Sequence, residues 1–345
     1  MSRILITGMT SPQTSRALNK KSLSFSGVIE KVLADDGNIV SMCEPDITWT
    51  RENLDIYDAV IVGLAPITSI SANHCYGALS VIDLMYDSGK LVLLVDAPNP
   101  AQISTSLRAV TSNPSNLAKS FYYNRRGYQL MTEQKTFDRV FGVISRLIDG
   151  HSDWPTTIYP SLPWKSNTSV VDELPYMAGV SLVDINLDAY LLQPQNPLVR
   201  DKRNVWAADS VTSTWMKKVV NTLNNPVELM KEHKGVDDKR VEEVLMSSLG
   251  SLITPHKGGT WWSYRYIQSL NQLTPVATNW QESMNIGDSW NVLAASIEHM
   301  LQAERDDLAV NQYKEYLSSI PNKKQALEDL YDALSISKKN RKVQA

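Results

Sequence analysis

Short apolar runs alternate with stretches of helical periodicity through the first hundred residues of the chain. The apolar runs predict strands over 4–7, 39–42, 57–63 and 91–95. The stretches between them predict helices over 23–33 and 72–86, which end at Asp36–Gly37 and Ser88–Gly89. Strands that are almost continuously apolar are typical of a parallel sheet covered on both faces, so this alternation predicts a doubly wound α/β domain.

Prolines change this pattern between about residues 153 and 203. They stand at Pro155, Pro160, Pro163, Pro175, Pro194 and Pro197. Proline at this density breaks helices and limits strands. The segment is therefore predicted to be the irregular end of the first domain, followed by a linker near residues 193–202.

A second α/β pattern follows the linker. Strands are predicted over 204–208, 252–253 and 275–278, and helices from 212, over 237–249 and over 261–270. Three more helices close the chain before a basic tail at 338–342. The predicted domains are 1–192, 203–310 and a C-terminal section, 311–345, of helices and tail.

Candidate functional residues of the first domain lie where its predicted strands end. Ligands of open α/β sheets bind beyond the carboxyl ends of the strands, and Gly8, residues 63–66 and residues 96–98 all follow such ends. Asp96 would place a carboxylate on this rim, where partial burial raises its pKa and suits it to act as a general base. An aspartate in this position also caps a following loop, which explains the same residue without catalysis.

The second domain carries a segment suited to an anion. Gly258 and Gly259 let the backbone approach a ligand closely, and Thr260 suits the N-cap of the helix that follows. Within that helix, Arg265 and Gln268 share a face with Trp261, so the arginine suits a diphosphate and the glutamine suits ribose hydroxyls. An amphipathic helix with a capped start and a surface arginine explains this pattern equally well.

Length, charge and cysteine content limit the classes of protein to which this chain can belong. With 345 residues and 38.6 kDa, the chain suits two domains. A net charge of −3 and a pI near 6.0 exclude a broadly basic surface, so nucleic acid would bind through a local patch. Two cysteines, an N-terminus that leads directly into a strand and the lack of a long apolar run predict a cytoplasmic protein without a membrane partner.

Several common catalytic motifs do not occur in the sequence. It has no G-x-x-x-x-G-K-[ST] loop, no G-x-G-x-x-G fingerprint, no G-x-S-x-G elbow and no H-E-x-x-H helix. The histidines have no zinc-ligand spacing, so no metal ligand is assigned. Arg125 and Arg126, with three tyrosines close by in the sequence, suit either a nucleic-acid backbone or a solvated surface.

Taken in order, these segments resemble the phage DNA β-glucosyltransferases of the GT-B fold, which move a sugar from a UDP-sugar to a hydroxymethylated base in phage DNA. Residues 91–98 resemble the family segment that ends in the catalytic aspartate, and residues 265–268 resemble the donor helix. In the family, an arginine of that helix binds the diphosphate and a glutamate three residues later binds ribose. Gln268 stands in place of this glutamate and offers hydrogen bonds without a charge.

The resemblance is weaker after the first strand of the second domain. The family has a glycine-serine loop there with arginines that bind the phosphates, and this chain has residues 209–214 instead. Ser210 and Lys217 are the candidates to replace these phosphate ligands, and the loop from His256 to Thr260 would supply some of the phosphate contacts.

The resemblance implies two Rossmann-like, doubly wound parallel-sheet domains facing a cleft, with C-terminal helices. Asp96 would remove the proton of an acceptor hydroxyl, while Arg265, the Gly258–Gly259 backbone and His256 would stabilise the departing diphosphate. The implied donor is a UDP-sugar, with UDP-glucose the first candidate, and its diphosphate would be neutralised by a divalent ion or by side chains alone.

A DNA acceptor implies that the modified base is flipped out of the duplex. The candidates for DNA backbone contacts are Arg108, Lys119, Arg125 and Arg126. If the protein is encoded by a phage, the host cytoplasm is its expected location.

Two other functions stay open on the sequence. A GT-B glycosyltransferase could act on a polysaccharide, a lipid or a small molecule, which the net charge of −3 favours. A non-catalytic module that binds a nucleotide sugar or DNA fits the altered loop at 209–214. Retention on duplex DNA that weakens steeply as salt rises would favour a DNA acceptor over the first alternative. Hydrolysis of a UDP-sugar would count against the second alternative, a non-catalytic module.

Overall fold

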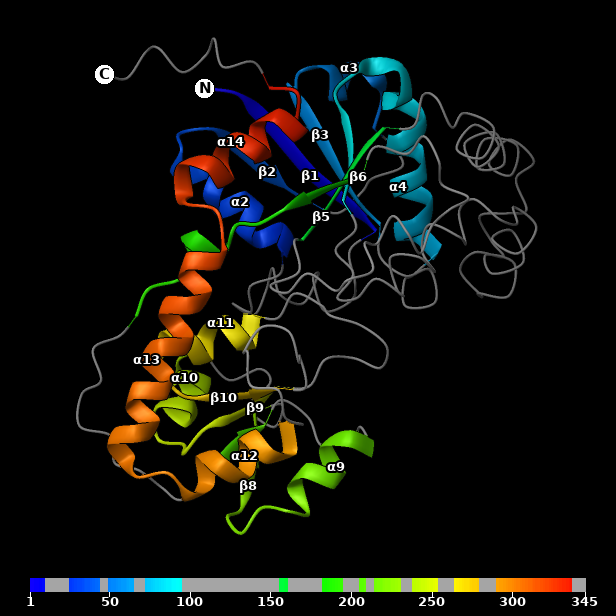
Figure 1. The fold of residues 1–345 in the computed structure, drawn as a ribbon. Coiled ribbons are helices and arrows are strands. Elements are labelled where there is room, and N and C mark those ends of the chain that lie inside the picture. The colour runs from blue at the N-terminus through cyan, green and yellow to red at the C-terminus, as the bar shows by residue number, and fades with distance from the viewer. Residues whose placement is uncertain are drawn as a thin grey trace.

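The computed structural model describes residues 1–9, 25–43, 49–64, 72–94, 155–160, 182–194, 205–208, 214–230, 238–253, 264–278 and 290–336. These residues form two parallel sheets, one of six strands and one of four, each with helices on both faces. The six-stranded sheet lies in the upper part of Figure 1 and the four-stranded sheet in the lower part. The prediction of two doubly wound parallel sheets with C-terminal helices is confirmed.

The first sheet has the strand order β2-β1-β3-β4-β5-β6, and all of its neighbouring strands are parallel. Its strands are β1 (Arg3–Met9), β2 (Ile39–Met42), β3 (Ala59–Leu64), β4 (Leu91–Leu94), β5 (Thr156–Pro160) and β6 (Leu182–Ile185). Because the chain passes from β1 to one side and later returns to the other, the strand order reverses between β1 and β3. Ligands of open α/β sheets bind at such a switch point.

Helices cover both faces of the first sheet because alternate strand residues point to opposite sides. Ile4 and Ile6 pack in one apolar cluster with α2 (Phe25–Asp35) and α14 (Lys323–Ala333). Against the other face, α4 (Ala72–Met85) contacts β1 and β3. The short helices of this part are α3 (Arg51–Asp55) and the 3₁₀ turns η2 (Tyr86–Ser88) and η5 (Asp188–Tyr190).

The helix ends predicted at Gly37 and Gly89 are confirmed. The chain leaves α2 through Gly37 with φ +83° and leaves η2 through Gly89 with φ +66°. Left-handed backbone at the end of a helix favours glycine, which has no Cβ to clash.

The prediction of an irregular segment from 153 to 203 is wrong in part, because β5 and β6 lie within it and complete the six-stranded sheet. Pro155 immediately precedes β5 and Pro160 is its last residue, so these prolines limit the strand without removing a ladder donor from its middle. Leu191 and Leu192, which directly precede the predicted linker, are buried core residues, and the linker itself stays a prediction.

The second sheet repeats the order of the first four strands of the first sheet. Its order is β10-β9-β7-β8, all parallel, with β7 (Trp206–Ala208), β8 (Val227–Leu229), β9 (Ser251–Ile253) and β10 (Val276–Thr278). The switch point therefore lies between β7 and β9. The sequence does not predict β8, because three residues after Pro226 are too few to establish an alternation.

Two groups of helices sandwich the second sheet. Ala207, Ile253 and Val276 face α10 (Asp238–Met246), α11 (Tyr264–Asn271) and α13 (Gln302–Ser319). Trp206 and Leu252, which point to the other side, pack with α9 (Thr214–Val220) and α12 (Trp290–His299). None of the helices within the described ranges has the length and apolarity needed to cross a lipid bilayer.

The C-terminal helices link the two sheets. Helix α13 runs beside the helices of the four-stranded sheet, and α14 returns to the six-stranded sheet (Figure 1). There the Tyr331 hydroxyl donates to the Asp36 carboxylate and accepts from the Asn38 amide, each at 2.5 Å. The domain boundary that the sequence predicts after residue 310 falls inside α13, and the boundaries at 192 and 203 stay predictions.

Candidate functional site

Predicted ligand-binding loops follow the two strands that flank the switch point of the second sheet. Ser210 comes two residues after the end of β7, and the residues from His256 to Thr260 follow the end of β9. Ser210, His256, Gly258, Gly259 and Thr260 themselves lie outside the described residues. Since the carboxyl ends of β7 and β9 are neighbours, both loops leave the sheet where its topology favours a ligand.

Helix α11 follows β9 and carries the predicted donor-binding pair. Arg265 lies in its first turn, is half-buried, and donates a hydrogen bond from Nη1 to Oε1 of Gln268 at 2.7 Å. Gln268 is only 1% exposed. The structure therefore brings these two predicted residues together, with the glutamine orienting the guanidinium.

Packing fixes the orientation of this helix. Its residues from Tyr266 to Leu270 are all buried, and Tyr266, Ile267 and Leu270 belong to the apolar cluster that includes Ile253 and Val276. Residues 266–270 of α11 are buried and Arg265 at its start is half-buried, so the alternative of an amphipathic helix with a surface arginine stays open. Arg265 is held on a rigid element, as a group that must meet a ligand in one geometry requires.

Two buried polar atoms beside this pair have no hydrogen-bond partner among the described residues: Nε2 of Gln268 and Oγ1 of Thr278. Thr278 ends β10 and is 4% exposed. It has the same strand parity as Val276, which faces α11, so its side chain lies on the face that α11 covers. A buried polar group without a partner costs about 1–3 kcal/mol, and such groups are often completed by a ligand or water.

Thr278 is a candidate site residue that the sequence does not single out. Its only signal is its position as the polar last residue of an apolar strand, the same signal that singled out Asp96 after the strand at 91–95. The strand at 275–278 was predicted, but no role was assigned to its last residue.

The predicted phosphate ligand Lys217 lies on the other side of the sheet. It is exposed on α9, which packs against Trp206 with α12, whereas Arg265 belongs to α11 on the opposite face. The structure does not bring Lys217 and Arg265 onto one surface of the sheet, and a role for Lys217 stays a prediction.

The switch point of the first sheet is built around Gly8. This residue has φ +115°, and a Cβ there would lie 2.6 Å from Cγ1 of Val62 and 2.7 Å from the backbone nitrogen of Gly63. Gly8 is the register partner of Gly63, so two residues without side chains face each other where β1 and β3 end. Glycine at this position therefore allows β1 and β3 to approach each other closely at their carboxyl ends.

Asp96 and the predicted DNA contacts lie outside the described residues. The strand that leads to Asp96, β4, ends at Leu94 and pairs with β3, so it belongs to the part of the sheet next to the switch point. The other undescribed candidates are Arg108, Lys119, Arg125 and Arg126.

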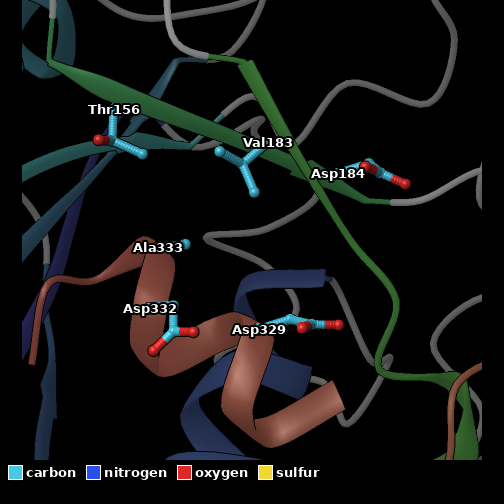
Figure 2. A pocket seen from close by; sticks show the side chains of 6 residues that line it. All are labelled: Thr156, Val183, Asp184, Asp329, Asp332 and Ala333. Carbon is cyan, nitrogen blue, oxygen red and sulfur yellow. The ribbon is translucent and has the colours of Figure 1, made fainter. Parts of the chain in front are cut away.

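A separate cavity of about 490 Å³ lies between β5, β6 and α14 (Figure 2). It is lined by Thr156, Val183, Asp184, Asp329, Asp332 and Ala333. Its lining includes the carboxylates of Asp184, Asp329 and Asp332, and negative charge there would repel a diphosphate. Within the described part of the chain, no group of His, Cys, Asp and Glu residues is arranged to hold a metal ion.

Comparisons by sequence and by structure give different results. No protein-family model matches the chain, and no curated protein matches it in sequence. A solved structure of T4 phage BGT in complex with UDP and Mn²⁺ does match, with a TM-score of 0.59 and 12% identity over 97% of this chain and 100% of that chain. The chain has the fold of this enzyme.

Two further solved structures agree with this result. An alpha-glucosyltransferase in complex with UDP and a 13-mer DNA containing an HMU base has a TM-score of 0.57 and 10% identity. An alpha-glucosyltransferase in complex with UDP-glucose and DNA containing an abasic site has a TM-score of 0.53 and 9% identity. Both matches cover 97% of this chain and 99% of the other. The predicted GT-B fold is therefore confirmed over nearly the whole chain, and identities this low show the fold alone.

Proposed function

We propose that this protein is a glycosyltransferase that moves a sugar from a UDP-sugar to a hydroxymethylated pyrimidine in phage DNA. The whole-chain likeness to structures solved with UDP, and in one case with DNA that contains an HMU base, supports this class. The observation that carries the proposal is the Arg265–Gln268 pair at the start of α11, beside the switch point of the second sheet.

The second sheet is proposed to bind the donor. Arg265 would pair with the diphosphate, and the loops that carry Ser210 and His256 would supply further contacts from the strand ends beside it. The unused Nε2 of Gln268 would donate to a ribose oxygen, and the Thr278 hydroxyl is free to bond to the same ligand. UDP-glucose is the donor we would test first.

The first sheet is proposed to hold the acceptor, with Asp96 as general base. Asp96 would take the proton of the acceptor hydroxyl while the hydroxyl oxygen attacks the anomeric carbon of the sugar. The bond from that carbon to the donor phosphate then breaks, and the electron pair leaves with UDP. Arg265, the Gly258–Gly259 backbone and His256 would stabilise the charge that develops on the diphosphate.

A base inside a duplex cannot reach Asp96, so the modified nucleotide would be flipped out of the stack. Arg108, Lys119, Arg125 and Arg126 are proposed to contact the DNA backbone. Neutralisation of the donor diphosphate by a divalent ion or by side chains alone stays open in this mechanism.

The defining experiment offers a panel of nucleotide sugars together with DNA that contains hydroxymethylated pyrimidines, and analyses the nucleosides by mass spectrometry. Transfer of a sugar to the modified base is expected. Absence of transfer from every donor to every modified base, with a protein that is folded by circular dichroism, would reject the proposed function.

The donor site is tested by calorimetry with UDP. Arg265→Ala should weaken binding about 10- to 100-fold, since one or two charged hydrogen bonds are lost. Arg240→Ala is the matched control, because Arg240 is an exposed arginine on α10 whose ion pair with Glu243 lies outside the site. Equal affinities in the two variants would remove Arg265 from the donor site.

The general base is tested separately from donor binding. Asp96→Asn and Asp96→Ala should both bind UDP like the wild type and should both lose transfer, because neither side chain accepts the hydroxyl proton. Full transfer by either variant would reject Asp96 as the base.

An acceptor other than DNA is the second candidate, favoured by the net charge of −3. An enzyme that binds DNA should be retained on immobilised duplex and released steeply as salt rises. Sugar transfer without any retention on DNA would favour a polysaccharide, lipid or small-molecule acceptor.

A further inference from the structure

A buried polar cluster connects helix α11 to the segment that follows β6. It consists of Asp188 in η5, Tyr316 in α13 and Tyr266 in α11, which are 1%, 4% and 3% exposed. The Tyr316 hydroxyl donates to the Asp188 carboxylate with an oxygen–oxygen distance of 2.5 Å. The ring of Tyr266 meets the ring of Tyr316 edge-on, with centroids 5.2 Å apart.

The electrostatics of the cluster keep its hydroxyl groups protonated. Burial raises the pKa of Tyr316, and the charge of Asp188 and the hydrogen bond to it raise this pKa further. Burial, followed by the charges of Glu315 and Asp188, also raises the pKa of Tyr266. Tyr316 therefore remains a hydrogen-bond donor to Asp188 throughout the physiological pH range.

The far end of α11 is tied to the same segment. Asn271, the last residue of the helix, donates from Nδ2 to the carbonyl oxygen of Leu191 at 2.8 Å and accepts at Oδ1 from the backbone N–H of Gln193 at 2.8 Å. Segment 188–193 thus contacts α11 near both of its ends. Near the start of the helix the contact runs from Asp188 through Tyr316 to the ring of Tyr266, and at its C-terminal end Asn271 makes the two hydrogen bonds.

This segment belongs to the chain of the first sheet, because it follows the edge strand β6 directly. Leu187, Leu191 and Leu192 lie in one apolar cluster that extends from Ile4 of β1 to Ile267 of α11. Apolar packing alone tolerates small rotations of a helix, whereas the edge-on ring contact near the start of α11 and the directional hydrogen bonds of Asn271 at its end restrict them. Arg265 directly precedes Tyr266, so a rotation of α11 displaces its guanidinium.

We propose that Asp188, Tyr316 and Asn271 are positioning residues for the transfer reaction. They hold α11 in a fixed relation to the six-stranded sheet, so that the diphosphate bound by Arg265 is presented to the acceptor held by the first sheet. The inference rests on the proposed function. Reactions of bound groups depend steeply on alignment, and a misplacement of about 1 Å lowers a rate by about 100-fold.

The test compares Tyr316→Phe and Asn271→Ala with the wild type and with the matched control Tyr313→Phe. Tyr313 lies one turn earlier on α13 and packs only at the border of the apolar cluster. Tyr316→Phe and Asn271→Ala should each lower kcat for transfer at least tenfold, while the dissociation constant of UDP changes less than twofold. Tyr313→Phe should change neither quantity.

Hydrogen exchange supplies a readout that does not depend on catalysis. In Tyr316→Phe, the amides of α11 and of segment 188–193 should exchange faster together, while those of β1 and β3 keep their rates. Asp188→Asn should rescue most of the activity that Asp188→Ala loses, because the amide oxygen still accepts from Tyr316.

A lower melting temperature with unchanged kcat in Tyr316→Phe and Asn271→Ala would overturn the proposal, as would an equal loss of kcat in Tyr313→Phe. If the wild type transfers no sugar at all, the proposed function fails on its own. In that case unchanged exchange of α11 in Tyr316→Phe overturns the link itself, and faster exchange of both segments retains it.

Discussion

Replacing Gly8 with alanine tests whether the edge of the first sheet is built as the structure shows. The new Cβ would lie 2.6 Å from Cγ1 of Val62, 2.7 Å from the nitrogen of Gly63 and 2.9 Å from its carbonyl oxygen. Two of these atoms are backbone of the neighbouring strand and cannot move without breaking the ladder. Overpacking of this kind costs about 1–3 kcal/mol, and the φ of +115° adds about 1–3 kcal/mol for a residue with a side chain.

Gly89→Ala is the matched control for this prediction. Gly89 also has a positive φ, +66°, but a Cβ there meets nothing within 4 Å, so only the backbone cost of about 1–2 kcal/mol applies. In urea unfolding monitored by circular dichroism, the free energy of unfolding of Gly8→Ala should therefore be about 1–4 kcal/mol lower than that of Gly89→Ala. Equal midpoints for the two variants would refute the close approach of β1 and β3.

Three further predictions concern polar side chains of the second sheet and of the helices that cover it. Hydrogen bonds from Asn224 and Asn225 outweigh desolvation and hold the pKa of Glu298 below its ordinary 4.5. Glu298→Gln should therefore lower the free energy of unfolding by about 1 kcal/mol at pH 7, and this difference should disappear as the pH falls below about 4.5. Melting curves recorded across this pH range would detect it. The Gln312 side chain accepts from the N–H of Val276 at 2.8 Å and donates to its C=O at 3.0 Å, on the edge strand β10. Gln312→Leu should therefore lower the free energy of unfolding in urea by about 2 kcal/mol. An unchanged midpoint would contradict this role. Thr278→Val should stabilise the free protein by about 1 kcal/mol, because it removes a buried hydroxyl without a partner, and a lower melting temperature would show that the hydroxyl is satisfied.

Local sequence pattern identified most strands correctly because each of them lies in an apolar run that is recognisable on its own. The run from Ile39 to Met42 is the strand β2 with the same bounds, and the helices before Gly37 and Gly89 end where glycine permits positive φ. By contrast, polar residues interrupt β5, β6 and β8, and prolines adjoin β5 and β8. Their strand conformation depends on ladder bonds to distant segments, which no local pattern reveals.

The candidate site divides in the same way. Arg265 and Gln268 were found because their three-residue spacing on a helix is visible in the sequence, and the structure joins them by a hydrogen bond. Thr278 escaped notice because its importance comes from the helix that covers it. The link from Tyr316 to Asp188 spans 128 residues of sequence, so nothing near either residue points to the other.

The sequence by itself determined the alternation of strands and helices, the parallel arrangement and the placement of glycine at the edge of the first sheet, since these follow from apolar periodicity and backbone sterics within short windows. Only the tertiary structure decided the strand order with its two switch points, the return of α14 to the first sheet and the attachment of α11 at both ends. These features depend on contacts between residues far apart in the chain, whose free energy is gained only when the separate segments are packed together.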